Sequence, residues 1–238
     1  MSDSIFNMLN MAGLAGWSII LLACLSNSIG DPTLLGALPF MSSFHSLSWR
    51  FFNVHDGRLP IIDTLFLLEL ICLVEVARIA SGQLKGNLIL GAVLHAIRLT
   101  CLCLVLPGGL ARLDADPGFY GSEHALCMAV LYSWSLTEVG RYPMYLFPAS
   151  GTARTVRVLL PLVTFPVGAA SEAVGAYGVL METMHLGDKK EMRHWAQICV
   201  LGMVVFVNGV LGPTMAYPAL WKKGLPILTG KASTKKEQ

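Results

Sequence analysis

The segment Val156–Met181, with the sequence VRVLLPLVTFPVGAASEAVGAYGVLM, decides the fold class. It is mainly apolar and longer than the roughly 20 residues that an α-helix needs to cross the hydrocarbon core of a membrane. Pro161 and Pro166 are tolerated in such helices because neighbouring groups satisfy the backbone carbonyls that a proline leaves free. The segment therefore predicts a transmembrane helix.

The composition of the whole chain agrees with a membrane protein. Of the 238 residues, 54% are hydrophobic and 13% are charged, and the mean hydropathy is +0.61. Soluble domains carry about 25% charged residues. These values exclude a disordered chain, a nucleic-acid-binding module and a secreted disulfide scaffold, so we expect no nucleic-acid partner.

Six apolar stretches, separated by polar, glycine or proline residues, predict an all-α bundle of six transmembrane helices. They cover about 13–28, 59–80, 88–106, 124–147, 156–181 and 195–221, and a polar tail follows over 224–238. Long linkers and internal repeats are absent from the sequence. We therefore expect a single domain over residues 1–238.

Ionisable residues inside the predicted helices are unusual, because each costs a few kcal/mol to place in a membrane. Glu75 and Arg78 are spaced three apart, as are His95 and Arg98, so each pair shares a helix face and can neutralise or support its partner. Glu69, nearly two turns before Glu75, is expected closer to a membrane interface. Structural pairing of helices is one interpretation, and a functional site is the other.

The fourth predicted helix holds the densest polar pattern. Glu138, Arg141, Tyr142 and Tyr145 follow the spacing i, i+3, i+4 and i+7, which places them on one stripe. Two interpretations stay open. The stripe is a structural hydrogen-bond network, or it is the polar wall of a cavity for a charged headgroup or a thioester substrate.

The fifth predicted helix holds the best candidate for acid or base chemistry, Glu172. Phe165 lies seven residues before it, two helical turns away on the same face. The small residues of 168–171 between them, which include Ser171, let a neighbouring helix or an acyl chain approach closely. A carboxylate in such a position can exchange protons with a substrate.

These residues resemble the 3-hydroxyacyl-CoA dehydratase family of fatty-acid elongation, formerly called protein-tyrosine-phosphatase-like. The strongest match is WSLTEVGRYPMY at Trp134–Tyr145, which fits the family pattern W-x-x-T-E-x-x-R-Y-x-x-Y. Further matches run along the whole chain: Asn10 with Gly16-Trp17, Val74-Glu75-Val76 with Gly82 and Arg98, Pro166-Val167-Gly168 with Ser171-Glu172, and Gly212-Pro213 with Tyr217 and Lys222-Lys223.

The resemblance implies that the chain removes water from a (3R)-3-hydroxyacyl-CoA to give the trans-2-enoyl-CoA. In the family a tyrosine and a glutamate, seven residues apart on one helix, supply the acid and the base, and no cofactor or metal is involved. Glu172 stands at the glutamate position, and Phe165 stands at the tyrosine position. Glu138, Arg141, Tyr142, Tyr145, Arg98, Glu75 and Ser171 are expected to form the supporting polar wall.

Phe165 keeps the aromatic ring of the family's tyrosine but lacks its hydroxyl group, so it is not competent for proton transfer. Arg78 also stands where the family has His, Thr155 where it often has Trp, and Val158 where it often has Tyr. These differences indicate a divergent member of the family.

Two functions follow from this divergence. The chain is a dehydratase, active or weakly active, that binds long-chain acyl-CoA and uses Tyr142, Tyr145, Ser171 or Tyr177 as proton donor. Alternatively it is an inactive pseudoenzyme that serves as a lipid-binding or structural subunit, with protein partners in a larger membrane complex. The C-terminal residues Lys235-Lys236-Glu237-Gln238 match a dilysine retrieval signal and favour the endoplasmic reticulum, and the mitochondrial inner membrane is the alternative.

Other functions fit less well. The six cysteines stand singly in apolar stretches without a CxxC pair, so neither a zinc site nor a disulfide framework is indicated: Cys24, Cys72, Cys101, Cys103, Cys127 and Cys199. No cysteine is followed by a correctly spaced arginine within a glycine-rich turn, as the Cys-x5-Arg loop of a phosphatase requires. His95 lacks an evident partner for haem among the other histidines, and no symmetric pair of interrupted helices suggests a transporter.

Overall fold

The computed structural model describes residues 3–29, 51–52, 60–84, 86–106, 122–185 and 192–229. These residues are helical and contain no strand, which confirms the all-α fold class. The helices are α1 (Asp3–Ile29), α4 (Pro60–Ala80), α5 (Leu88–Thr100) continued by the π-helix η1 (Cys101–Val105), α6 (Ser122–Leu146), α7 (Gly151–His185), and α8 (Met192–Phe206) continued by the π-helix η2 (Val207–Ala216) and by α9 (Tyr217–Leu228).

Each predicted helix overlaps one of these helical segments, but several ends differ. The helix α1 begins at Asp3, well before residue 13, and the added turns include the buried Asn10. The final helix continues to Leu228, since Gly224 is buried and packs closely against Leu162 of α7. The rest of the predicted tail, with Lys235-Lys236-Glu237-Gln238, lies outside the described residues.

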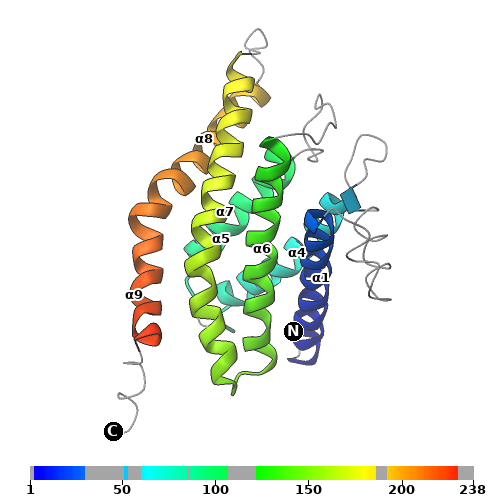
Figure 1. Ribbon diagram of the computed structural model, residues 1–238, viewed down its shortest axis with the longest axis vertical. Helices are drawn as coiled ribbons and strands as arrows, with labels where there is room; N and C mark the ends of the chain where they lie inside the picture. Colours follow the sequence, from blue (N-terminus) through cyan, green and yellow to red (C-terminus); the bar gives the residue numbers. More distant parts are fainter. Residues whose placement is uncertain are drawn as a thin grey trace.

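The helix α6 occupies the centre of the arrangement. It lies beside α7 on one side and α1 on the other, while α8 and α9 flank the far side of α7, and α4 and α5 pass behind (Figure 1). Large apolar side chains from all these layers are fully buried together, among them Trp17, Ile20, Leu65, Leu102, Leu131 and Leu201. The polar residues of α6 are thus placed in the interior, within reach of its neighbours.

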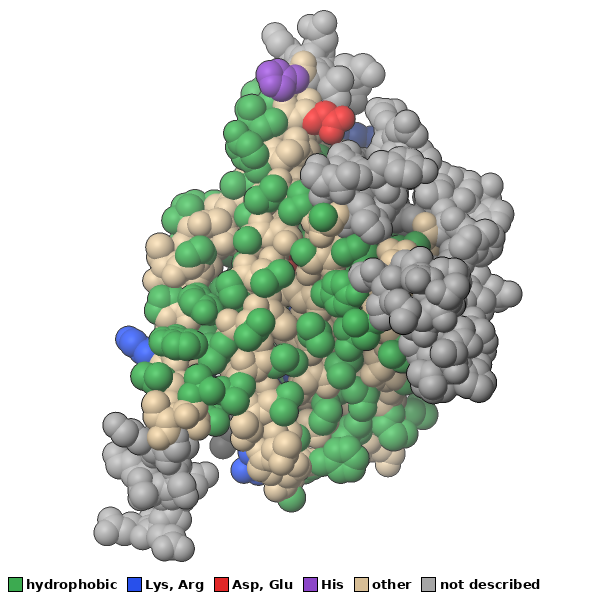
Figure 2. Space-filling view, viewed as in Figure 1, with side chains coloured by type: hydrophobic (Ala, Val, Ile, Leu, Met, Phe, Trp, Pro, Cys, Tyr) green, Lys and Arg blue, Asp and Glu red, His purple; other side chains and the backbone are tan. Residues whose placement is uncertain are grey.

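The outer surface is apolar, as expected for helices in contact with lipid. Hydrophobic side chains spread over the face seen in Figure 2, and the few charged groups lie near its edges. Within the described residues, four helical segments are long and apolar enough to span a membrane: Ser4–Asn27, Leu88–Val105, Gly151–His185 and Met192–Leu228. This protein is therefore a membrane protein, and spans by α4 and α6, which carry the charged residues, stay a prediction.

A close approach between α6 and α7 depends on Gly168. The hydroxyl of Ser133 on α6 donates to the carbonyl oxygen of Thr164 at 2.6 Å, one turn before the glycine. A Cβ atom on Gly168 would lie 2.2 Å from Ser133 Oγ and 2.9 Å from Ser133 Cβ. The glycine therefore sets how near the two helices come.

We expect Gly168→Ala to destabilise the protein by about 1–3 kcal/mol, because the added methyl group must push Ser133 away and separate the helices. Gly178→Ala, in the same helix, is the matched control, since a Cβ atom there meets nothing within 4 Å. The thermal unfolding midpoint of each purified variant in detergent measures the effect. Equal midpoints for the two variants would contradict this account of the helix contact.

Candidate functional site

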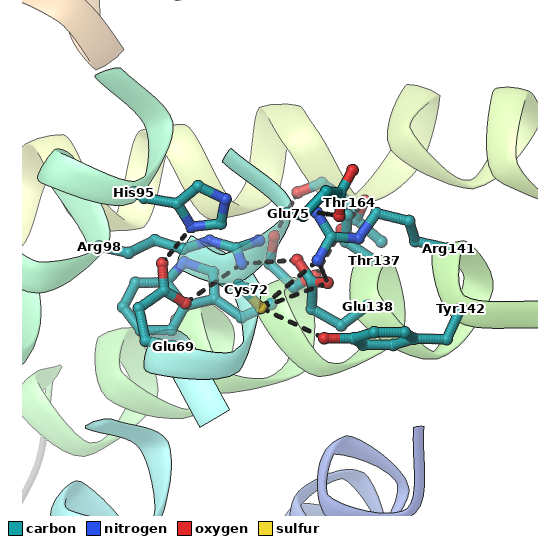
Figure 3. A network of polar contacts seen from close by, with 12 residues as sticks. Glu69, Cys72, Glu75, His95, Arg98, Thr137, Glu138, Arg141, Tyr142 and Thr164 are labelled. Carbon is teal, nitrogen blue, oxygen red and sulfur yellow. Dashed lines mark hydrogen bonds and ion pairs between the residues drawn. The ribbon is translucent and has the colours of Figure 1, made fainter. Parts of the chain in front are cut away.

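Glu138 lies at the centre of a buried network of charges (Figure 3). Its two carboxylate oxygens accept hydrogen bonds from two different arginines. Arg98 Nη1 of α5 donates to Oε1 at 2.6 Å, and Arg141 Nη2 of α6 donates to Oε2 at 2.6 Å. The short contacts are those expected of charge-assisted hydrogen bonds.

The network extends from each arginine to a second carboxylate, and both carboxylates belong to α4. Arg98 Nη1 lies 3.6 Å from Glu69 Oε2, and Arg141 Nη1 lies 3.1 Å from Glu75 Oε2. Negative and positive groups therefore alternate along the series Glu69, Arg98, Glu138, Arg141 and Glu75. Each guanidinium lies between two carboxylates, which is the arrangement that offsets the cost of burying charge.

Neutral side chains complete this network. His95 Nδ1 hydrogen-bonds to Glu69, and the hydroxyl of Tyr145 donates to Glu75. The thiol of Cys72 lies 3.4 Å from Arg141 Nη2 and 3.4 Å from the hydroxyl of Tyr142. The network thus ties α4, α5 and α6 together through their side chains.

Apart from Glu138–Arg141 within α6, the ion pairs cross between helices, which the spacing within each helix did not reveal. Glu75 is bound by Arg141 and Tyr145 of α6, while Arg78 donates from Nε to Gln83 at 3.2 Å and stacks 3.7 Å above the ring of Phe6. Glu69, expected nearer a membrane interface, is wholly buried within the protein. Its position follows from its two partners, His95 and Arg98, on α5.

A second polar site surrounds Glu172, which is buried in α7 with 5% of its surface exposed. Trp134 Nε1 of α6 donates to Oε1 at 2.5 Å, and Asn208 Nδ2 of η2 donates to Oε2 at 2.5 Å. Ser171, beside Glu172 in the sequence, is buried as well. Both hydrogen bonds to this carboxylate come from neutral donors.

Trp134 connects the two polar sites. The guanidinium carbon of Arg98 lies 5.4 Å from the centre of the indole ring of Trp134, a cation–π distance. The same guanidinium lies 6.0 Å from the ring of Trp17 on α1. The arginine that binds Glu138 therefore also fixes the side chain that binds Glu172.

Phe165 lies half-buried on α7, and its ring faces η2. A Cβ atom on Gly212 would lie 3.4 Å from Cζ of this ring, the carbon that carries the hydroxyl group in a tyrosine. Phe165 and Glu172 thus both face η2, through Gly212 and Asn208 respectively.

The tyrosines considered as alternative proton donors have other contacts. Among the hydrogen bonds between described residues, the hydroxyl of Tyr142 is 3.4 Å from the Cys72 thiol, and the hydroxyl of Tyr145 binds Glu75. Tyr177 is 53% exposed on the outer surface of α7. The interhelical hydrogen bonds and ion pairs of the predicted stripe on α6 are therefore directed to α4 and α5.

Asn208, Glu69 and Cys72 belong to these sites but were not identified as site residues from the sequence. A neutral amide or a single thiol in an apolar helix does not indicate a site until its hydrogen-bond partner on another helix is known. Within the described parts of the chain, no group of three His, Cys, Asp or Glu side chains could hold a metal ion.

Comparison with known protein families identifies the family of the chain. The sequence model of the protein tyrosine phosphatase-like family, PTPLA, matches residues 69–223. The chain belongs to this family. The matched region begins at Glu69 and includes Glu138, Glu172 and Asn208. It confirms the resemblance to the very-long-chain 3-hydroxyacyl-CoA dehydratases. No curated protein and no solved structure matches the sequence.

We expect Glu138→Gln to destabilise the protein by about 3–5 kcal/mol, since it removes the charge shared by Arg98 and Arg141 and leaves two buried guanidiniums poorly compensated. Asp63→Asn is the control, because Asp63 is an exposed carboxylate in the first turn of α4, the helix that also carries Glu69 and Glu75. The control should change stability by no more than about 0.5 kcal/mol.

Thermal unfolding in detergent compares the two variants. A Glu138→Gln protein as stable as Asp63→Asn would show that the charge network does not hold α4, α5 and α6 together.

Proposed function

We propose that this protein is a 3-hydroxyacyl-CoA dehydratase-like protein that binds long-chain acyl thioesters and dehydrates them poorly because Phe165 replaces the family's tyrosine. The observation that carries the proposal is the contrast within α7. Glu172 is buried and held at both oxygens, while the residue two turns before it presents only a hydrocarbon ring.

Dehydration requires two proton transfers. A base takes the proton from C2 of the acyl chain, and an acid protonates the C3 hydroxyl group, which leaves as water while the double bond forms. Glu172 is suited to one of these steps. Loss of the partner that performs the other step typically lowers the rate by about 10² to 10⁴.

The packing around Phe165 supports an otherwise intact site. Cζ of the ring, where the hydroxyl group of a tyrosine would be attached, faces Gly212, which has no side chain. The hydrogen bonds of Glu172 come from Trp134 and Asn208 and do not involve the ring. Restoring the tyrosine therefore requires no rearrangement of the contacts that hold the carboxylate.

The proposed location is the membrane of the endoplasmic reticulum, where fatty-acid elongation of this family takes place. The family membership and the dilysine pattern at Lys235-Lys236 support it. A role as an inactive subunit of a larger complex, with the mitochondrial inner membrane as its location, is the alternative, and a complete absence of turnover by the wild type in the following experiment would favour it.

The test is dehydration of a long-chain 3-hydroxyacyl-CoA by the purified protein in detergent or liposomes. We expect little turnover by the wild type and a gain of about 10² or more in Phe165→Tyr, since the substitution restores a general acid or base. Phe165→Tyr combined with Glu172→Ala should lose the gain, because the second proton-transfer group is then missing.

Two outcomes would contradict the proposal. Rapid turnover by the wild type that Glu172→Ala abolishes would mean that Tyr142, Tyr145, Ser171 or Tyr177 replaces the missing hydroxyl. Failure of Phe165→Tyr to restore turnover in a folded protein would mean that Phe165 is not the decisive defect, and would favour the subunit role.

A further inference from the structure

We propose that Asn208 is a positioning residue for Glu172, and that together with Trp134 it confines the exchangeable proton of the carboxyl group to Oε2. The inference rests on the proposed function, because it concerns the carboxylate that would exchange a proton with the substrate. Asn208 is the polar side chain that η2 contributes to the site around Glu172.

The indole of Trp134 determines the state of Oε1. An indole N–H is a donor only and has no acceptor atom for a carboxyl proton. Because Trp134 Nε1 lies 2.5 Å from Oε1, this oxygen must act as an acceptor whether the carboxyl group is ionised or protonated. The carbonyl oxygen of a protonated carboxyl group is a better acceptor than its hydroxyl oxygen, so this contact favours the proton on Oε2.

Asn208 is the partner of that second oxygen, and its side chain suits both states of the carboxyl group. Nδ2 donates to Oε2 at 2.5 Å, which matches the ionised form. Rotation of the amide group presents Oδ1, an acceptor that can receive the hydrogen bond of a protonated Oε2. Asn208 can therefore hold Glu172 in one orientation in both the ionised and the protonated state.

The backbone around Asn208 places it for this role. It lies in η2, a π-helical segment, and such wide turns occur frequently at functional sites. Gly212 of the same segment packs against the ring of Phe165. One segment thus contacts both positions that carry the acid and the base in the family, so a displacement of η2 would affect both at once.

The charged and titratable groups around Glu172 belong to other helices. Arg98 of α5 and Glu69 of α4 are near enough to interact with it electrostatically, as is the thiol of Cys101 in η1. Arg98 is itself bound to Glu138 and Glu69, and Trp134 lies against it. Asn208 is therefore the partner whose substitution leaves the charge network in place.

Infrared spectroscopy tests the proposal without requiring turnover. The difference spectrum between acidic and neutral pH contains the carbonyl band of protonated Glu172, which is identified by its absence in Glu172→Gln. Trp134→Phe removes the donor to the carbonyl oxygen Oε1, and Asn208→Leu removes the partner of the O–H group on Oε2. We expect both variants to shift the band to higher wavenumber.

Thr214→Val is the matched control, because Thr214 lies in the same π-helical segment and its hydroxyl bonds within that segment, to the carbonyl of Val210. It should leave the band unchanged. Asn208→Gln, which retains an amide group, should return the band toward the wild-type position. If Asn208→Leu does not fold, Asn208→Ala removes the amide without adding bulk and takes its place.

An unchanged band in folded Asn208→Leu or Asn208→Ala would overturn the role of Asn208, and an unchanged band in Trp134→Phe would overturn the placement of the proton on Oε2. Both outcomes are independent of whether Phe165→Tyr restores dehydration, so failure of this inference is distinguishable from failure of the proposed function. Where Phe165→Tyr is active, adding Asn208→Leu should lower kcat roughly tenfold, the loss expected for one hydrogen bond to a charged group, with KM little changed.

Discussion

The hydrogen bonds from two arginines to Glu138 are the interaction on which the rest of this structure depends. A charged group inside a membrane protein is tolerated only when it is paired, and here one carboxylate neutralises side chains from α5 and from its own helix. The same arginines reach back to Glu69 and Glu75 on α4. Side chains of three helices are thereby held together by charge.

This network also determines how the second site is built. Arg98 binds Glu138 and lies over the indole of Trp134, and Trp134 in turn donates to Glu172. The two kinds of carboxylate have different surroundings, since Glu138 contacts guanidiniums while Glu172 contacts an indole and an amide. A carboxylate between guanidiniums is committed to pairing, whereas one held by neutral donors remains free to exchange a proton.

The sequence predicted the helices, because apolar length is a property of short segments, and the motif at Trp134–Tyr145 singled out the polar stripe of α6. It did not predict the partners. A spacing of three residues, as between Glu75 and Arg78, is compatible with an ion pair within one helix and also with separate contacts from each residue to other helices. Which of these forms depends on how α4 lies relative to α6. Asn208 was missed for a related reason, since an amide among apolar residues gains its meaning from Glu172, on another helix.

Phe165 shows how far fold and chemistry are separable in this chain. Its ring packs against the backbone of η2 at Gly212, a contact that depends on the shape of the ring and would be shared by a tyrosine. The hydrogen bonds of Glu172 arise from α6 and η2, and the charge network arises from α4, α5 and α6. None of these contacts uses the missing hydroxyl group, so the helical arrangement persists without it. Under the proposed function, a phenylalanine at this position would therefore affect proton transfer while the helical scaffold keeps its contacts.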